Sequence, residues 1–467
     1  MTRPRQTKII ATLGPATDTP ESIAELIDAG ADIFRLNMSH ARHDWAARVT
    51  DHIRQAADQK PIAILADLQG PAIRTHAVEK PFHLEKGQPF TFNTDNRESG
   101  PNSVSVNYPG MASDLAPGDI VLIDNGLIRM KVIDSREDAI DCEVLIGGEM
   151  GSRRHINLPG VKVNLPALTK KDHADLRCIL DLGVDYIALS FVREAADIQQ
   201  LREATAHIKN PPKLIAKIED QHAVKHLEPI LETADAIMIA RGDLGIECPF
   251  EELPIIQRRI AKLCQQRGRP VIVATHMLES MIAAPHPTRA EVTDVANAVY
   301  EQADAIMLSG ETSIGKFPKI CLQAADRIAR RIERSGGANY HAHAPLNDPR
   351  QKLARAAVRM ADDLRAQAII VFTKTGRMIP ETAHMRPRHA SIIALCPDQT
   401  TARSLALHRA VHPLIFHWDT AAAAETIDQA LDQIVQAGHL QKGKTVILLS
   451  SRQALEEISD SIQMRVV

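Results

Sequence analysis

Lys217 and Glu219 stand two residues apart at the end of a short apolar run, Leu214 to Ile218. Residues two apart project to the same side of a β-strand, so an ammonium and a carboxylate would be presented together. The next apolar run leads into Arg241-Gly242-Asp243, which adds a carboxylate on a glycine-flanked turn where backbone N–H groups can face an anion. Two carboxylates suit Mg²⁺, and the lysine would neutralise a transferring phosphoryl group.

A lysine and a glutamate at such a place could instead form a salt bridge that only ties strands together. Taken alone, the pair supports both interpretations. A second pattern of period two, Arg35-x-Asn37-x-Ser39, and Asp67 after the following run favour a reaction site. Arg35 offers a fork matched to phosphate, and the other side chains offer hard oxygens for a monovalent cation. Polar residues also follow two later runs, at Thr275-His276 and Ser309-Gly310-Glu311.

Eight short apolar runs, separated by segments of helical periodicity, place these residues. Runs that are apolar throughout indicate parallel strands buried on both faces. Eight such β-α units are the number that closes a (β/α)8 TIM barrel, whose chemistry lies at the carboxyl ends of the strands. We therefore predict an α/β chain built on this barrel. The predicted strands are Lys8 to Leu13, Ile33 to Leu36, Ile62 to Ala66, Tyr186 to Phe191, Leu214 to Ile218, Ala236 to Ala240, Val271 to Thr275 and Ala305 to Leu308.

Residues 71–158 interrupt this alternation after the third predicted strand. The stretch is too long for a connection and carries turn signals between short alternating strands. We predict an inserted all-β, barrel-like lid domain here, with the catalytic barrel formed by residues 1–70 and 159–334. The expected hairpin turns are Pro109-Gly110, Pro117-Gly118-Asp119, Asp124-Asn125-Gly126 and Gly147-Gly148.

A polar stretch at residues 335–345 loses periodicity and is typical of a linker. Residues 345–467 are expected to form a C-terminal α/β regulatory domain, because apolar runs again alternate with helical segments. The expected strands are Ala368 to Phe372, Ser391 to Leu395 and Thr445 to Leu449, and the expected helices include Lys352 to Leu364 and Thr426 to Val435.

The composition agrees with a multidomain globular protein. The 467 residues exceed one ordinary hydrophobic core, and the chain is 44% hydrophobic and 24% charged, with a net charge of −3. No run of one charge sign favours a nucleic-acid partner, and no apolar stretch suggests a signal peptide or a membrane span. The six cysteines lack C-x-x-C spacing, so neither a zinc site nor a disulfide framework is expected. We expect a cytoplasmic protein.

The strand ends carry motifs that resemble the pyruvate kinase family over almost the whole chain. The segments are KIIATLGP at residues 8–15, RLNMSH at 35–40, IAKIE at 215–219, ARGDLGIE at 240–247, ATHMLESM at 274–281, PTRAEVTDVANA at 287–298 and LSGET at 308–312. The resemblance implies Mg²⁺-dependent phosphoryl transfer from phosphoenolpyruvate to ADP, giving pyruvate and ATP in the last step of glycolysis. It also implies a homotetramer.

By the same resemblance, Glu219 and Asp243 hold Mg²⁺ (or Mn²⁺), while Lys217 and Arg35 stabilise the transferring group. Thr275 and the backbone at Gly242 and Asp243 hold the substrate carboxylate. A relay near Thr275, Ser309 and Glu311 protonates the enolate. His276 stands where relatives carry Gln, so it would either tune that relay or form the hydrogen bond that Gln forms.

The resemblance places K⁺ at Asn37, Ser39, Asp67 and the Leu68 carbonyl. Potassium-dependent relatives carry Thr, Lys and Glu at Leu68, Gln69 and Ala72, and potassium-independent ones supply a lysine charge there. Ala72 supplies neither charge. A K⁺ requirement is expected, because the cation is the remaining way to fill this electrostatic gap, but the alternative stays open.

Nucleotide binding is assigned by resemblance to Arg74, His40 and Arg153. Arg153-Arg154 replaces a lysine pair and faces either nucleotide phosphates or solvent. An effector phosphate would bind the loop Thr373-Lys374-Thr375-Gly376-Arg377, unless that loop is a structural turn. Met378 replaces a serine of the phosphate cradle, and residues 450–457 replace the glycine-rich loop that closes over fructose 1,6-bisphosphate, so we do not expect activation by that sugar.

Two other functions compete with this prediction. One is another Mg²⁺-dependent barrel enzyme that handles phosphoenolpyruvate or pyruvate, against which the inserted and C-terminal domains count. The other is a catalytically silent sensor of phosphometabolites, which loss of Lys217, Glu219 or Asp243 would mark. All three residues are present.

Overall fold

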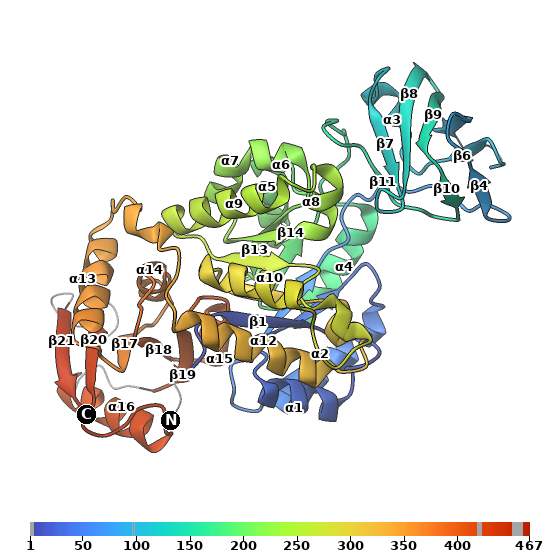
Figure 1. Ribbon diagram of the computed structural model, residues 1–467. Coiled ribbons are helices and arrows are strands. Elements are labelled where there is room, and N and C mark those ends of the chain that lie inside the picture. Colours follow the sequence, from blue (N-terminus) through green and yellow to red (C-terminus); the bar gives the residue numbers. More distant parts are fainter. Residues whose placement is uncertain (1–3, 96, 98, 418–422, 451–460) are drawn as a thin grey trace.

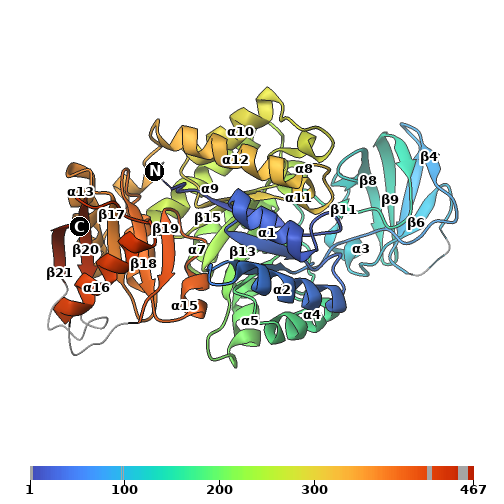
Figure 2. The same cartoon turned by 90° about the horizontal axis from the view of Figure 1, so that it is seen from below.

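The computed structural model describes residues 4–95, 97, 99–417, 423–450 and 461–467. The chain forms an elongated molecule with a closed barrel in the middle, a β-rich lid at one end and an α/β domain at the other (Figure 1). The view turned by 90° shows the same order of the three parts (Figure 2). Among the described residues, no helix combines the length and the apolar character needed to cross a membrane.

The barrel contains all eight predicted strands, in the order β1-β16-β15-β14-β13-β12-β3-β2. Every neighbouring pair is parallel, so the carboxyl ends meet at one mouth. Their side chains are almost all buried, as expected for strands covered on both faces. The bounds are β1 Lys8–Thr12, β2 Ile33–Asn37, β3 Ala63–Asp67, β12 Tyr186–Leu189, β13 Lys213–Ile218, β14 Ala236–Ala240, β15 Val271–Ala274 and β16 Ala305–Leu308.

Helices surround the barrel and bury their apolar stripes against its outer face. Thr19, Thr169 and Thr288 begin three of them with capping boxes, which satisfy the free N–H groups of the first turn. The bounds are α1 Pro20–Ala29, α2 His43–Ala57, α4 Lys170–Asp181, α5 Ala195–Thr205, α6 Gln221–Lys225, α7 Leu227–Thr233, α8 Arg241–Glu247, α9 Leu253–Arg267, η1 Glu279–Ile282, α10 Arg289–Tyr300, α11 Gly310–Ser313 and α12 Pro318–Glu333.

The inserted segment forms a six-stranded sheet in the order β11-β7-β8-β9-β5-β6 and a two-stranded sheet of β10 and β4. Asp124 and Asn125 adopt positive φ values of 53° and 58° in the predicted hairpin turn between β7 and β8. The predicted hairpin turn at Pro109-Gly110 is wrong, because Gly110 instead begins a short helix. The bounds are β4 Phe82–Leu84, β5 Pro89–Asn93, β6 Ser103–Ser105, α3 Met111–Asp114, β7 Ile120–Ile123, β8 Ile128–Arg136, β9 Ala139–Ile146, β10 Gly148–Met150 and β11 Ile156–Asn157.

The C-terminal part has a five-stranded sheet in the order β19-β18-β17-β20-β21. The three predicted strands form its buried centre, whereas β19 and β21 lie at its edges, are less buried and were not predicted. An edge strand lacks the continuous apolar run that identifies a buried one. The bounds are η2 Tyr340–His343, α13 Pro349–Asp363, β17 Ala368–Phe372, α14 Met378–His384, β18 Ser391–Cys396, α15 Gln399–Ser404, β19 Val411–Ile415, α16 Ala423–Gln436, β20 Thr445–Ser450 and β21 Ser461–Val466.

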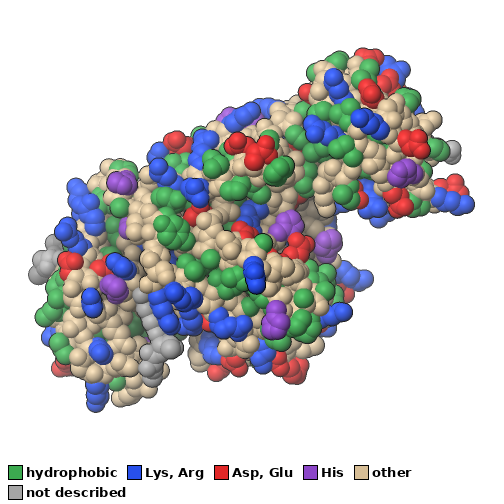
Figure 3. Space-filling model, viewed as in Figure 1, with side chains coloured by type: hydrophobic (Ala, Val, Ile, Leu, Met, Phe, Trp, Pro, Cys, Tyr) green, Lys and Arg blue, Asp and Glu red, His purple; other side chains and the backbone are tan. Residues whose placement is uncertain are grey.

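This C-terminal part docks on the amino-terminal end of the barrel, away from the mouth. Arg386 forms a bidentate ion pair with Asp304, which precedes β16, and both Nη–Oδ distances are 2.6 Å. Arg403 donates to Asp185, which precedes β12, at 2.9 Å. In the space-filling view the lid stands out from the barrel, with a recess between the two bodies (Figure 3).

Candidate active site at the barrel mouth

Four charged side chains from β2, β3 and β13 form a buried cluster at the mouth. Lys217 Nζ lies 2.9 Å from Glu219 Oε1 and 3.3 Å from Asp67 Oδ1. Arg35 binds the other oxygen of Asp67 at 2.7 Å. The period-two spacing of Lys217 and Glu219 does present both side chains to one place. The structure therefore shows the salt bridge, and the reaction site stays a prediction.

Burial and charge act against each other on the ionisation of this cluster. Burial disfavours the charged ammonium of Lys217, but the Asp67 and Glu219 carboxylates outweigh it and raise the lysine pKa. Burial also opposes ionisation of Asp67, yet Lys217 and Arg35 lower the pKa of that carboxyl below its usual range. Burial raises the pKa of Glu219 to about 7, with the nearby Asp243 charge contributing.

Asp243 lies in the first turn of α8, and the predicted glycine-flanked turn is in fact the start of this helix. Gly242 N–H donates to Thr275 Oγ1 at 2.7 Å, so that N–H group already has a partner. Arg241 is buried, binds Asp294 at 2.6 Å and donates to the carbonyl of Thr275 at 2.6 Å. These bonds fix the start of α8 against the loop that follows β15.

Glu219 and Asp243 provide a donor set that fits a divalent cation. Both are carboxylates at the ends of adjacent strands, and their mutual repulsion contributes to the raised pKa of Glu219. A cation between them would remove that repulsion. The part of the chain that the structure describes holds no group of three His, Cys, Asp or Glu residues arranged as a metal cage. Mg²⁺ suits a site with only two protein ligands, because it keeps several bound waters and takes oxygens of the substrate as its other ligands.

The predicted monovalent-cation residues come together at the ends of β2 and β3, where Asn37 and Asp67 are directly paired. Asn37 Oδ1 accepts the N–H of Ser39 at 3.2 Å, and Ser39 is exposed. The Leu68 carbonyl accepts a bond of 2.8 Å from Ser190. The structure thus places these residues at the ends of two neighbouring strands, and Asp67 is the one carboxylate among them.

Thr275 and His276 both have positive φ values, 67° and 54°, which is rare for residues with a branched or bulky side chain. The Thr275 hydroxyl accepts from Gly242 and donates to the Ala274 carbonyl at 2.6 Å. The imidazole of His276 is 61% exposed and lies 3.5 Å from Glu279. His276 thus faces the solvent side of this loop.

Glu311 is buried and bound on both oxygens by main-chain N–H groups. Leu278 donates to it at 3.0 Å and Ser309 at 2.7 Å. The carboxylate therefore joins the loops after β15 and β16. Ser309 is partly exposed at the same rim.

Two of the predicted nucleotide-binding residues lie on the lid. Arg74 Nη1 donates to the carbonyl of Arg153 at 3.1 Å. Both arginines are exposed and line a cavity of about 740 Å³ together with Thr75, His76 and Asn107. His40 is exposed after β2 and does not line this cavity.

The predicted effector loop follows β17 and closes on itself. The buried Thr373 hydroxyl accepts the N–H of Gly376 at 2.8 Å, and Gly376 has φ 77°. Lys374, Thr375 and Arg377 are exposed, and α14 then begins at Met378. The segment expected to face this loop lies largely outside the described residues.

Sequence reasoning missed Ser190 and His155. Ser190 accepts from Lys217 Nζ at 2.7 Å and so links the cluster to Leu68. The signal was available, because Ser190 is a polar residue near the end of the fourth predicted strand, as other polar residues are near the ends of theirs. His155 forms an isolated antiparallel bridge with Arg74 just before β11, and no local pattern indicates that it lines the pocket between lid and barrel.

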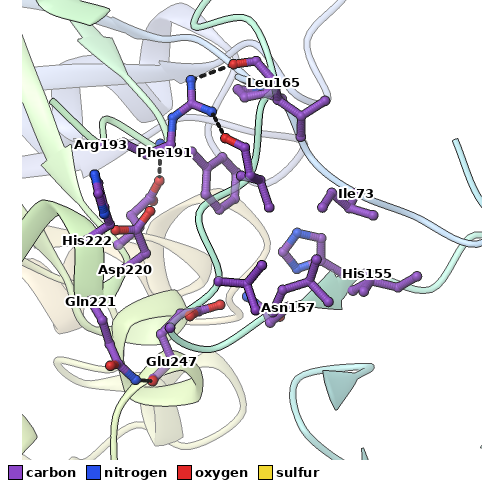
Figure 4. A pocket seen from close by; sticks show the side chains of 17 residues that line it. Ile73, His155, Asn157, Leu165, Phe191, Arg193, Asp220, Gln221, His222 and Glu247 are labelled. Atoms are coloured by element: carbon purple, nitrogen blue, oxygen red, sulfur yellow. Dashed lines mark hydrogen bonds between the residues drawn. The ribbon is translucent and has the colours of Figure 1, made fainter. Parts of the chain in front are cut away.

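A small pocket of about 60 Å³ lies between lid and barrel, lined by His155, Phe191, Glu219 and Glu247 among others. Figure 4 shows His155 and Phe191 on its walls, with Glu247 below them. Burial raises the pKa of Glu247 to about 7. Arg193 donates to the carbonyls of Val163 and Leu165 at 2.9 and 2.6 Å, which ties the returning lid segment to the barrel.

Comparisons with known proteins identify the family and the fold. Residues 4–322 match the family model "Pyruvate kinase, barrel domain", and residues 351–461 match "Pyruvate kinase, alpha/beta domain". The chain is 40% identical to a pyruvate kinase of Methylorubrum extorquens, over 92% of this chain and 90% of that protein. It is 39% identical to plastidial pyruvate kinase 2 of Arabidopsis thaliana, over 96% and 78%. A crystal structure of a pyruvate kinase from Cryptosporidium parvum superposes with a TM-score of 0.93 at 34% identity, covering 99% of this chain and 96% of the other.

Proposed function

Because the chain belongs to the pyruvate kinase family, we propose that the cluster of Lys217, Glu219 and Asp67 is where it transfers a phosphoryl group from phosphoenolpyruvate to ADP. The chain is a phosphotransferase, and its substrates follow from its family: phosphoenolpyruvate and ADP are consumed, and pyruvate and ATP are formed. The observation that carries the assignment of the site is the buried ammonium of Lys217, held between two carboxylates at the mouth.

The phosphoryl group lies against Lys217 and Arg35 in this proposal. Both cations are held in place by Asp67, so little reorganisation is needed when charge develops on the transferring group. Glu219 and Asp243 hold Mg²⁺, or Mn²⁺ in its place. That ion, when bound, supplies positive charge and orients the phosphoryl oxygens.

The substrate carboxylate is held at the start of α8 and at Thr275. The Gly242 N–H is already bound to the Thr275 hydroxyl, so the N–H of Asp243 in this first turn, with the partial positive charge of the helix start, favours the anion. Gly242 is bound to the Thr275 hydroxyl, so the two residues present one rigid surface. The relay that protonates the enolate is assigned to Thr275 and Ser309. We assign Glu311 to orienting their loops, because both of its oxygens are engaged by main-chain N–H groups.

The ADP phosphates are bound by the lid through Arg74 and Arg153, with His40 approaching from the barrel side. Three exposed arginines line this cavity, but Arg97 is paired with Asp95 and Asp138. Arg74 and Arg153 therefore suit a diphosphate best, because each guanidinium can bind two phosphate oxygens. Closure of the lid would bring these charges towards the cluster that contains Lys217.

A monovalent cation, K⁺, is held by Asn37, Ser39, Asp67 and the Leu68 carbonyl. The set consists of hard oxygens, which fit an alkali cation. Regulation by a phosphorylated effector is assigned to the exposed cations of the loop Thr373–Arg377. We further infer a homotetramer, as is usual in the family.

The experiment that tests this function measures pyruvate formation from phosphoenolpyruvate and ADP with Mg²⁺ in the purified chain. The assay is run with and without K⁺ and with a panel of sugar phosphates and nucleotides. Turnover that needs both substrates is the expected result. Absence of turnover under every condition would refute the assignment.

A further inference from the structure

Phe191, which follows β12, holds one oxygen of the proposed metal ligand Glu219. Its backbone N–H donates to Glu219 Oε2 at 2.6 Å. Phe191 has φ 54°, a left-handed conformation that a residue with a large side chain adopts only where its surroundings enforce it. Contacts from neighbouring residues must therefore hold Phe191 in this conformation.

The hinge of the lid provides one contact to the Phe191 ring. Gly70 lies where the chain leaves the barrel for the lid, and its N–H donates to Asp172 at 3.1 Å. A Cβ atom on Gly70 would lie 3.3 Å from Phe191 Cδ2 and 2.9 Å from the Ser190 carbonyl oxygen. The ring thus packs closely against the fixed base of the lid.

The lid itself provides the second contact through His155. The centroids of the His155 and Phe191 rings are 5.9 Å apart, and the rings are tilted by 47°. The His155 carbonyl accepts the N–H of Asp124 at 3.0 Å, and the residue pairs with Arg74 in an antiparallel bridge. The ring therefore moves with the lid and with the proposed ADP-binding arginine.

We propose that His155 is a positioning residue that couples the lid to the metal site. Its ring packs against Phe191 and holds that residue in place. The Phe191 N–H then keeps the Glu219 carboxylate in the orientation that binds a divalent cation. The inference rests on the proposed role of Glu219 in binding the metal. The position of the lid and the affinity for the metal are then linked through this one ring contact. The nucleotide would influence the position of the lid through Arg74.

The contact acts through ring packing rather than through the charge of the imidazole. Burial, with Arg74 contributing, lowers the pKa of His155 against the opposing effect of Asp243, so the imidazole is neutral at neutral pH. Ile73 and Phe191 line the same pocket beside it. A phenyl ring at residue 155 should therefore replace the imidazole.

The test measures Mn²⁺ binding to the full-length protein by electron paramagnetic resonance, which needs no turnover. We expect His155→Ala to weaken Mn²⁺ binding about tenfold. Loss of a direct partner of a metal ligand costs about 10- to 100-fold, and His155 acts one contact further out, through Phe191. His155→Phe should restore the affinity. Hydrogen exchange at the Phe191 amide should rise in His155→Ala and return to normal in His155→Phe. His83→Ala, at an exposed histidine on β4 of the same lid, is the matched control and should bind like the parent.

The outcomes separate this inference from the proposed function. If the parent protein binds no Mn²⁺, the metal site itself is refuted and the inference with it. If the parent binds and His155→Ala binds equally well, only the coupling is refuted. A His155→Phe variant that is as weak as His155→Ala would also overturn the role of the ring contact, and it does so even if the alanine variant folds poorly.

Discussion

Lys217 Nζ lies 2.9 Å from Glu219 Oε1, in a site where both side chains are nearly inaccessible to solvent. The same ammonium contacts Asp67 and Ser190, so it is held in place before any substrate arrives. A phosphoryl group that develops negative charge meets a cation that need not move. The carboxylate that holds the lysine is also the proposed metal ligand, which makes the functions of the two residues inseparable.

Lys217→Met should reduce kcat about 10³-fold, because the variant lacks the cation that faces the transferring group. Mn²⁺ binding should be retained or strengthened, since the Glu219 carboxylate loses a competing cation. Steady-state kinetics and electron paramagnetic resonance check the two parts. Lys213→Met, at the exposed start of the same strand, is the control. Turnover close to that of the parent would contradict the role of Lys217.

Mg²⁺ should stabilise the protein more at pH 8 than at pH 5. The raised pKa of Glu219, about 7, means that this carboxyl is mostly protonated in the metal-free folded state below about pH 7 and ionised above it. Stability from this group is full below the unfolded pKa of about 4.5 and is lost as the pH rises through about 7. A divalent cation bound to the ionised Glu219 carboxylate offsets this loss of stability at high pH. Thermal unfolding with and without Mg²⁺ across this range measures the effect.

Two variants test whether Glu219 causes this pH dependence of the Mg²⁺ effect. In Glu219→Gln the difference between the curves with and without Mg²⁺ should disappear. Glu247→Gln removes a second carboxyl whose pKa burial raises to about 7, but it should leave the Mg²⁺-dependent part intact. An unchanged Mg²⁺ effect in Glu219→Gln would argue against this residue as a ligand.

Asp304→Asn should lower the free energy of unfolding by about 3 kcal/mol, because it leaves the buried Arg386 guanidinium without its charge partner. Denaturant titration measures the change. The control is Asp28→Asn, which breaks the exposed Lys60–Asp28 pair and should change stability by less than about 1 kcal/mol. Equal effects of the two substitutions would show that the buried pair does not hold the domains together.

Acid should loosen the contact between the C-terminal part and the barrel. His384 on α14 contacts the Gln265 carbonyl through Nε2, and its buried Nδ1 has no hydrogen-bond partner among the residues that the structure describes. Burial lowers the pKa of His384 to about 4. Stability from this neutral imidazole is full above the unfolded pKa of about 6.5 and is lost as the pH falls towards 4.

Unfolding midpoints between pH 7 and pH 4 check this prediction. His384→Gln keeps a donor for the Gln265 carbonyl but does not titrate, so its midpoint should fall less steeply than that of the parent. Parallel curves for the two proteins would exclude His384 as a source of the acid sensitivity.

Potassium should raise the rate at least about tenfold over tetramethylammonium at equal ionic strength. The reason is that a cation beside Asp67 adds positive charge near the transferring phosphoryl group. Asn37→Ala should raise the K⁺ concentration needed for half-maximal rate, because it deletes an oxygen donor at the end of β2. Asn93→Ala in the lid serves as a distant control. Full activity without any monovalent cation would contradict the site.

The barrel could be recognised from the sequence because its determinants are local. Each strand is a short apolar run, and each ends in residues whose spacing puts them on one side, as Lys217 and Glu219 show. The turn at Asp124-Asn125-Gly126 was equally readable, because its backbone conformation needs those residue types. The edge strands β19 and β21 were not, since each buries too little to leave an apolar run.

The ring of polar strand ends at the mouth was also within reach of the sequence, once eight parallel strands were assumed. The sequence did not predict which group each of these side chains contacts. Glu311 binds two main-chain N–H groups, Ser190 joins Lys217 to Leu68, and His155 reaches Phe191 from another part of the fold.

The ionisation of the site likewise depends on the assembled fold. Glu219 acquires its raised pKa from burial and from the neighbouring charge of Asp243, which comes from a different strand. Residue types and spacing therefore determined which groups stand at the mouth of the barrel. Only tertiary packing decided their protonation, their orientation and their connection to the lid, because desolvation and contacts between distant segments exist only when the chain is folded.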